Sequence, residues 1–248
     1  MNSNAHMQSE LSIKGLASKA SICNLCIVRN ITMCSVLNDE ELQNMSDISD
    51  GLFCLPNEVI CAEGETAKFI YNIRAGCVRI SKMLPDGRRQ IIGFLFAGDF
   101  FGLSNGDGHS YSAEAITSVD LCKISQPKLF QNFQKLPVLG QKVLNMSLAD
   151  LNDAAEKMLL LGRKNAKEKL CSFLLVMSKK SSLMSEIPIG KIYLPMSRSD
   201  IADYLGLTIE TISRQFTILA NDNIIAMDKS PIIDLLNLQR LELIASGE

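Results

Sequence analysis

The chain has 248 residues, of which 47% are hydrophobic and 21% are charged, and its formal net charge is −2. This composition excludes a disordered or fibrous chain, and the charge gives no overall electrostatic case for binding nucleic acid, so such a case must come from local geometry. The apolar runs are shorter than the roughly 18 residues of a membrane span and the N-terminus lacks a signal-peptide layout, so we expect a cytoplasmic protein with no membrane partner.

The first feature along the chain is a cysteine-rich segment, CNLCIVRNITMC, in which Cys23, Cys26 and Cys34 have C-x2-C-x7-C spacing. Because the cytoplasm is reducing, clustered cysteines there are more often metal ligands or redox groups than disulfides. Three thiolates on one short loop can reach one metal centre, and a four-coordinate centre needs one more ligand. The alternatives are a redox enzyme that uses these cysteines as an electron carrier, and plain reduced thiols without a metal.

Residues 49–102 alternate short β-rich runs with turn residues, which predicts an antiparallel roll or barrel. Within this region Pro85, Asp86 and Gly87 predict a hairpin turn, because proline presets the turn dihedral and glycine accepts a positive φ.

The remaining cysteines and the histidines show no ligand spacing. Four cysteines lie in strand-like or apolar helical contexts and are expected to be small buried side chains: Cys54, Cys61, Cys77 and Cys171. His6 and His109 have no partner at a useful spacing, so we expect solvated loop residues.

A long helix is predicted from Pro137, because few turn residues follow. One stripe of this helix repeats with the a/d spacing of a coiled coil: Leu144, Leu148, Leu151, Ala155 and Met158. The stripe is either a core-facing surface or a homodimer seam. In a seam Asp150 and Asp153 would lie close to the stripe, where two copies repel, so the dimer would be marginal and switchable.

The C-terminal region reads as a helix-turn-helix followed by a two-stranded wing. Ser197 and Asp200 form a capping box, Gly206 ends the first helix, and Thr208 caps the second. The second helix has an apolar stripe and an opposite polar face: Ile209, Ile212, Phe216 and Leu219 against Glu210, Ser213 and Arg214. A helix pair with a short turn is also common in α-domains that bind no DNA.

The polar face of the second helix carries groups suited to reading bases. Arg214 can donate to both guanine O6 and N7, Glu210 can accept from cytosine N4, and Ser213 can contact several base edges. The alternative is a surface pair between Glu210 and Arg214, worth roughly 0.2–0.5 kcal/mol.

Taken in order, the cysteine loop, the roll with AGDFFG, the long helix leading into LLLGRKNAKEKL, and SRSDIADYLGLTIETISR resemble the FNR branch of the cAMP receptor protein (Crp/Fnr) superfamily. The E-T-x-S-R pattern of that branch is matched by Glu210, Thr211, Ser213 and Arg214. The cAMP-responsive branch has an arginine before the glutamate, where this chain has Ile209, and a glycine in place of Ser213. The resemblance therefore implies inverted TTGAT half-sites as operators.

The resemblance also implies an architecture of the α+β class. We expect an N-terminal cysteine loop over 1–40, a cyclic-nucleotide-binding-like β-roll over 41–136, a dimerisation helix over 137–165 and a winged helix-turn-helix over 166–248. The implied partners are double-stranded DNA, a second copy of the chain and RNA polymerase, and the implied function is transcription regulation rather than catalysis. The expected DNA contacts are Glu210, Thr211, Ser213, Arg214, Ser197 and Arg198.

In the FNR branch a fourth cysteine follows the roll, and DLCKIS supplies Cys122 in that setting. The family holds a [4Fe–4S] cluster on these four cysteines. The implied mechanism is that the intact cluster keeps the loop against the roll and the long helix, which favours the dimer, and that oxygen releases the loop. Cys61 or Cys77 replaces Cys122 if the roll folds differently, and structural zinc is the alternative metal.

Relatives that bind cyclic nucleotides grip the phosphate with an Arg-Ser-Ala or Arg-Thr-Ala run. In FFGLSNGDGHSYSAEA the corresponding position is Tyr111, before Ser112 and Ala113, and no glutamate follows the glycine. A buried phosphate would lack its bidentate partner, so no cyclic nucleotide is expected. A regulator with an idle thiol loop that senses a different ligand in the roll remains as an alternative.

Overall fold

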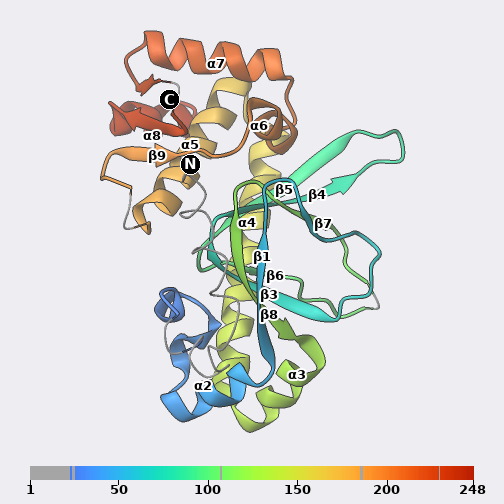
Figure 1. The fold of residues 1–248 in the computed structure, drawn as a ribbon. Coiled ribbons are helices and arrows are strands. Elements are labelled where there is room, and N and C mark those ends of the chain that lie inside the picture. Colours follow the sequence, from blue (N-terminus) through green and yellow to red (C-terminus); the bar gives the residue numbers. More distant parts are fainter. Residues whose placement is uncertain (1–22, 24–25, 107, 185–186, 229) are drawn as a thin grey trace, which may run out of the picture.

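The computed structural model describes residues 23, 26–106, 108–184, 187–228 and 230–248. His6 lies outside these residues. The chain forms a β-roll and a C-terminal helical region, and one long helix runs between them (Figure 1). No helix in the described part of the chain is both long and apolar enough to cross a membrane.

The roll consists of two four-stranded antiparallel sheets, with strand orders β1-β8-β3-β6 and β2-β7-β4-β5. Its strands are β1 (Ser49–Cys54), β2 (Val59–Cys61), β3 (Phe69–Ala75), β4 (Cys77–Met83), β5 (Arg89–Phe96), β6 (Phe100–Phe101), β7 (Ser112–Ala115) and β8 (Val119–Ser125). Alternate side chains of both sheets fill the space between them, as the period of two in a strand requires. This interior includes Cys54, Cys61, Tyr71, Ile73, Val78, Phe101 and Leu121. The predicted antiparallel roll is confirmed.

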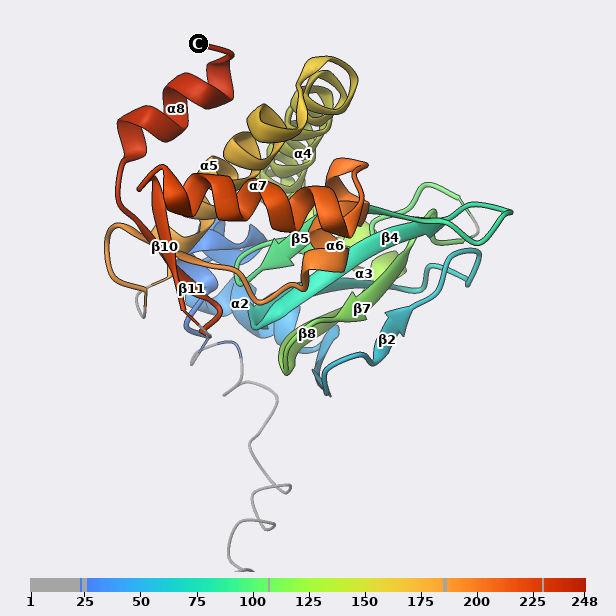
Figure 2. The ribbon, with the colours of Figure 1, turned by 90° about the horizontal axis from the view of Figure 1, so that it is seen from above.

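The hairpin predicted at Pro85 is present between β4 and β5. Leu84 N donates to Arg88 O at 2.8 Å, and Gly87 has φ +85°, the conformation that glycine adopts without strain. The hairpin projects from the body of the roll (Figure 2).

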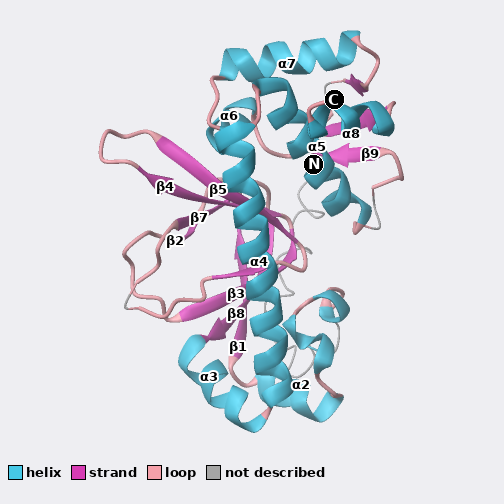
Figure 3. Cartoon of the chain, turned by 180° about the vertical axis from the view of Figure 1, so that it is seen from behind, coloured by secondary structure: helices cyan, strands magenta, loops and turns pink. Residues whose placement is uncertain are grey.

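Helices flank the roll on its outer side. They are η1 (Arg29–Ile31), η2 (Met33–Val36), α2 (Asp39–Ser46), α3 (Gln126–Lys135) and α4 (Pro137–Arg163). Helix α4 begins at Pro137 as predicted, because proline needs no N–H partner in a first helical turn. It runs along the roll from α2 and α3 at one end to the C-terminal region at the other (Figure 3).

The C-terminal region is a helix-turn-helix with a small sheet. Its elements are α5 (Ala166–Ser182), β9 (Lys191–Tyr193), α6 (Arg198–Leu205), α7 (Ile209–Asn221), β10 (Ile225–Met227), β11 (Ile232–Leu235) and α8 (Leu238–Ser246). The predicted wing strands are β10 and β11, and β9 adds a third strand to their sheet. The prediction missed β9 because three residues are too short to show a period.

The roll and the C-terminal region meet at a contact between β4–β5 and α6, which we call the junction. Asp200 Oδ1 accepts from Arg79 Nη1 at 3.2 Å and from Arg89 Nη2 at 2.8 Å. Arg89 Nε also donates to Asp203 Oδ2 at 2.8 Å, and Gln90 Nε2 donates to Asp203 O at 2.7 Å. The side chain of Asp200 is only 6% exposed, so these contacts are shielded from water.

Candidate cysteine site and DNA-reading surface

The cysteine loop is fixed against the start of α4. Thr32 is buried, and its Oγ1 accepts from Cys34 N at 3.3 Å, which caps the short helix η2. Met33 is fully buried in the same apolar cluster as Leu139 and Val143 of α4. The position of the loop is therefore tied to the position of the long helix.

Strand β8 carries Cys122 to the same place. Leu121 belongs to the interior of the roll, whereas Cys122 and Ile124 face the outer cluster that contains Met33. Cys23 and Cys34 pack against this outer cluster as well. The structure thus brings Cys122 together with the loop cysteines.

The other cysteines are elsewhere. Cys61 lies in the interior of the roll, and Cys77 lies in the cluster shared with the C-terminal region. Neither packs with the loop cysteines. The four cysteines that were predicted to be buried are all buried, which confirms that prediction: Cys54, Cys61, Cys77 and Cys171.

Burial sets the chemistry of the clustered thiols. It raises the pKa of Cys34 to about 12, and the neighbouring charges of Cys122, Cys23 and Cys26 act in the same direction. Burial also raises the pKa of Cys122 to about 11 and raises the pKa of Cys23. The mutual influence places the four sulfurs within electrostatic range of one another. These thiols stay protonated at neutral pH unless a cation compensates their charge.

The four sulfurs do not converge on a point. Within the described ranges, no three Cys, His, Asp or Glu side chains come close enough to hold a single metal ion. Tetrahedral zinc has Zn–S distances of about 2.3 Å, which puts its sulfurs within about 4 Å of one another.

The positions of His109 and Tyr111 in the roll bear on two of the predictions made from the sequence. His109 was predicted to be solvated, which is wrong, since the residue is 6% exposed. Its N–H donates to Glu65 O and its carbonyl accepts from Gly64 N, both at 2.8 Å, so the loop folds over it. Tyr111 packs against the roll interior, and its hydroxyl accepts from Gly102 N at 2.9 Å.

The helix-turn-helix has the predicted local geometry. Ser197 Oγ accepts from Asp200 N at 3.0 Å and Asp200 Oδ2 accepts from Ser197 N at 3.1 Å, which completes the capping box of α6. Gly206 ends that helix with φ +63°, and Thr208 Oγ1 accepts from Thr211 N at 3.2 Å to begin α7. These caps fix the angle between α6 and α7.

Helix α7 exposes the predicted polar face. Glu210, Ser213 and Arg214 are exposed, whereas Ile212 and Phe216 are buried. A bond to its own backbone N–H and one to the Thr208 hydroxyl lower the pKa of Glu210, so its carboxylate is ionised and ready to accept. Among the residues described, no ion pair joins Glu210 to Arg214, so both remain available to a partner.

Three details of α6 and α7 differ from expectation or refine it. Ile209 was placed on the apolar face but is 46% exposed. The guanidinium carbon of Arg198 lies 3.2 Å from the centre of the Phe216 ring, and its Nη2 lies 3.2 Å from Met227 Sδ, so the side chain braces α7 against the wing. Burial lowers the pKa of Arg198 to about 10. Ser197 uses its hydroxyl in the cap.

The stripe along α4 faces solvent in the single chain. Leu144, Leu148, Leu151 and Met158 are 57%, 50%, 63% and 71% exposed, and Ala155 is exposed too. The core-facing interpretation of the stripe is therefore wrong. A row of exposed large apolar side chains on one helix face marks an interaction surface.

Comparisons with known proteins agree with this arrangement. Residues 53–135 match the model of the cyclic nucleotide-binding domain, and residues 168–244 match the Crp-like helix-turn-helix domain. The chain is 36% identical over 225 residues to the nitrogen fixation regulation protein FixK of Bradyrhizobium diazoefficiens, covering 91% of this chain and 94% of that protein.

Two further matches extend this similarity. The chain is 33% identical over 210 residues to the transcriptional activator protein FnrL of Cereibacter sphaeroides, covering 83% of this chain and 84% of that protein. The solved structure of FixK2 from Bradyrhizobium japonicum matches with a TM-score of 0.75 and 37% identity, covering 79% of this chain and 97% of the other.

Proposed function

The chain belongs to the Crp/Fnr family of DNA-binding transcription regulators, and from this premise we propose that it regulates transcription in response to oxygen through a [4Fe–4S] cluster. It is a regulator rather than an enzyme. The observation that carries the proposal is the meeting of three loop cysteines with Cys122 on the outer face of the roll, next to the start of α4.

The donor set fits a cluster better than it fits zinc. Four thiolates are the usual ligands of a cubane cluster, which would separate its ligands more widely than one ion does. Within the described residues no three of these side chains are close enough to hold a single metal ion, which supports the wider group. Cys23, Cys26, Cys34 and Cys122 would hold it. When bound, the cluster supplies the iron that compensates the buried thiolates and the oxygen-labile bonds of the sensor.

The residues around the loop supply the link to DNA. Met33 and Leu37 pack with Leu139 and Val143, so a loop held at its cysteines also supports the first turns of α4. Release of the loop would remove this support from the helix that carries the exposed stripe. We propose that the stripe is a homodimer seam, because only a dimer places two reading helices about one DNA turn apart.

The first experiment is purification of the full chain without oxygen, followed by measurement of visible absorption, iron, sulfide, zinc and sedimentation before and after air. We expect a brown protein with about four irons per chain, the count of a cubane cluster, that bleaches in air and loses its dimer. Cys122→Ala should abolish the colour, and Cys61→Ala, a buried cysteine of the roll interior, is the matched control. A colourless dimer, with or without zinc, that binds TTGAT sites in air would sink the sensor and leave DNA binding standing.

We propose that α7 reads inverted TTGAT half-sites through Glu210, Ser213 and Arg214, with Thr211 alongside them and Ser197 and Arg198 at the start of α6. Arg214→Ala should weaken binding by about 1–3 kcal/mol and relax discrimination at one base pair. A titration against all single-base variants of the site measures this. An equal loss on every sequence would identify Arg214 as a phosphate contact instead.

We propose that the roll binds no cyclic nucleotide and that the DNA-bound dimer contacts RNA polymerase. The Tyr111 hydroxyl accepts a hydrogen bond from Gly102 N inside the roll, which supports a roll that binds no cyclic nucleotide. RNA polymerase is the proposed partner of the DNA-bound dimer, in line with the relatives that are named transcriptional activators.

A further inference from the structure

Buried polar groups without partners are concentrated around the cysteines. Across the described chain, four buried side-chain atoms have no hydrogen-bond partner: Ser46 Oγ, Asn72 Oδ1, Arg74 Nε and Gln215 Oε1. The first three belong to residues that surround the cysteine site, and only Gln215 lies in the C-terminal region. Native proteins leave few such groups, so three at one place require an explanation.

Strand register and an ion pair place two of these residues beside Cys122. Asn72 is the direct cross-strand partner of Cys122 in the β3–β8 ladder. Because side chains alternate along a strand, Asn72 shares the outer face with Cys122, whereas Ile73 points into the roll. The β3–β8 register shifts at Arg74, but Arg74 Nη2 pairs with Oδ1 of Asp120, two residues before Cys122 on β8, which puts Arg74 on the same outer face.

Ser46, the last residue of α2, approaches from the other side. It is 2% exposed and follows Met45, which belongs to the apolar cluster that Cys23 packs against, and its hydroxyl has no hydrogen-bond partner of good geometry within the described residues. Ser49 is also near Cys23 and Cys122, but its hydroxyl hydrogen is donated to Met45 O at 2.7 Å. Of these two serines, only Ser46 lacks a backbone acceptor for its hydroxyl hydrogen among the described residues.

These groups are matched to one kind of ligand. The Ser46 hydroxyl and Arg74 Nε are donors, and rotation of the Asn72 amide by 180° presents its NH2 group in place of its oxygen. Leaving a buried donor unpaired costs about 1–3 kcal/mol, whereas a bond from a charged donor to an anionic sulfur is among the stronger kinds. The ligand that satisfies them is anionic and rich in acceptors.

We propose that Ser46, Asn72 and Arg74 form a donor shell around the group held by the four cysteines. The inference rests on the proposed function and deepens it: the group carries acceptor sulfurs of its own, as an iron–sulfur cluster with inorganic sulfide does. These three residues position and stabilise the cluster without binding its iron. Donors to cluster sulfurs and second-layer partners of metal ligands govern how firmly such groups are held.

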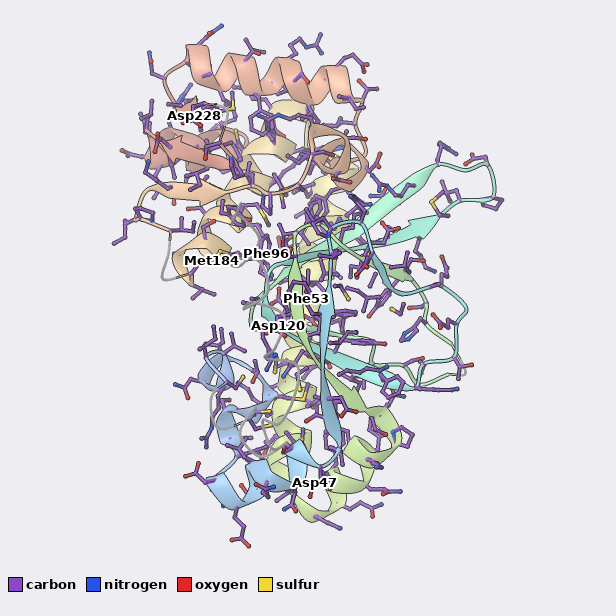
Figure 4. All side chains as sticks on the ribbon, viewed as in Figure 1. Asp47, Phe53, Phe96, Asp120, Met184 and Asp228 are labelled. Carbon is purple, nitrogen blue, oxygen red and sulfur yellow. The ribbon has the colours of Figure 1, made fainter. Side chains whose placement is uncertain are left out.

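Substitutions of Arg74 and of its ion-pair partner Asp120 should change the rate of iron loss in opposite directions. Asp120, labelled in Figure 4, lies on β8 two residues before Cys122, and its Oδ1 accepts from Arg74 Nη2 at 2.5 Å. Arg74→Gln removes the positive charge and the Nε donor. Asp120→Asn removes the carboxylate that offsets the charge of Arg74, so the cluster feels more of that charge.

The experiment measures the rate at which the full chain, purified without oxygen, loses iron to a chelator under nitrogen. We expect Arg74→Gln to lose iron about tenfold faster than the unmodified chain and Asp120→Asn to lose it more slowly. Arg88→Gln is the matched control, since Arg88 pairs with Asp86 on the exposed tip of the hairpin and should leave the rate unchanged. Circular dichroism of each variant checks the fold.

The outcomes separate this inference from the proposed function. If the unmodified chain holds four irons and Arg74→Gln loses them no faster than Arg88→Gln, the donor shell is wrong and the sensor stands. If Arg74→Gln does not fold, Arg74→Lys keeps the charge without the Nε donor and should lose iron at an intermediate rate; an unchanged rate would also overturn the shell. An unmodified chain that binds no iron overturns both.

Discussion

The cysteine site and the junction both bury polar side chains, but they pair them differently. At the junction, the Asp200 carboxylate accepts hydrogen bonds from two arginines and the Asp203 carboxylate accepts one from Arg89. The Gln90 amide donates to a backbone carbonyl. At the cysteine site, Ser46, Asn72 and Arg74 each keep a polar atom without a hydrogen bond to the described chain. Both regions lie on the outside of the same roll.

At the junction the polar groups find their partners within the chain, whereas at the cysteine site some buried polar atoms have no partner in the described chain. The junction closes on itself, so it fixes the helix-turn-helix relative to the roll whatever the roll holds. The cysteine site has buried donors without partners and thiols of raised pKa, which are costly to bury unless a cation and sulfur acceptors are bound, as the proposed function requires. Under the proposed function, sensitivity to a signal would belong to the cysteine site.

The largest expected effect is at the junction. Asp200→Ala removes the shared carboxylate from Arg79 and Arg89 and also removes the N3 partner of the Ser197 cap. Breaking a buried ion pair by deleting one partner costs about 3–5 kcal/mol, and we expect a loss of stability of that order. Urea denaturation of the metal-free chain measures it.

The matched control is Asp86→Ala, which deletes the carboxylate of the exposed pair with Arg88 at the tip of the same hairpin. Surface pairs contribute about 0–1 kcal/mol, so this variant should stay close to the unmodified chain. Equal losses in the two variants would mean that the junction is not a closed network and would remove one side of the comparison.

A smaller effect of opposite sign is expected at the cysteine site. Asn72→Leu replaces a buried amide whose oxygen has no partner by an apolar group of similar size, so the metal-free chain should gain about 1–3 kcal/mol. The metal-loaded chain should not share this gain, because the amide then has acceptors to bond. Denaturation of both forms under nitrogen compares them.

Gln215→Leu is the control for Asn72→Leu. Gln215 is also buried with an unpartnered oxygen, but it lies on α7, away from the cysteines. Its substitution should change stability equally in the metal-free and metal-loaded chains. If Asn72→Leu behaves like Gln215→Leu in both forms, the amide takes no part in holding the metal group.

The sequence predicts the parts of this molecule that local chemistry decides. The caps at Ser197, Gly206 and Thr208 are short-range signals, and all three occur as expected. The exposed stripe of α4 follows from periodicity, although only the structure excludes a core-facing role. The position of Cys122 next to the loop matches the resemblance to the family rather than any spacing.

The features that the sequence does not predict depend on contacts between segments far apart in the chain. Asn72 reaches Cys122 only through the register of β3 and β8, which no local pattern encodes. His109 is buried because its loop bonds to residues 64 and 65, far away in the sequence. A polar residue in an apolar strand, such as Asn72, is the one signal that points to the donor shell, since asparagine is uncommon in strands.

A pH-dependent effect is expected from Lys157 of α4, which makes no ion pair with a carboxylate among the described residues of the junction. Lys157 Nζ donates to Ile91 O at 2.9 Å and lies 3.5 Å from the centre of the Tyr204 ring, and burial lowers the pKa of Lys157 to about 7. The unfolded chain therefore binds more protons than the folded chain between about pH 7 and pH 10.5, so stability rises with pH across that window.

Lys157→Met should remove this pH dependence. The variant should be more stable than the unmodified chain at pH 6, and the difference should shrink toward pH 10, with a slope below the limit of about 1.4 kcal/mol per pH unit for one proton. Lys157→Arg keeps its charge over the whole range and should not gain stability with pH. Parallel stability profiles for the unmodified chain and Lys157→Met would show that Lys157 is charged in the folded state, and the junction would then contain an unbalanced charge of its own.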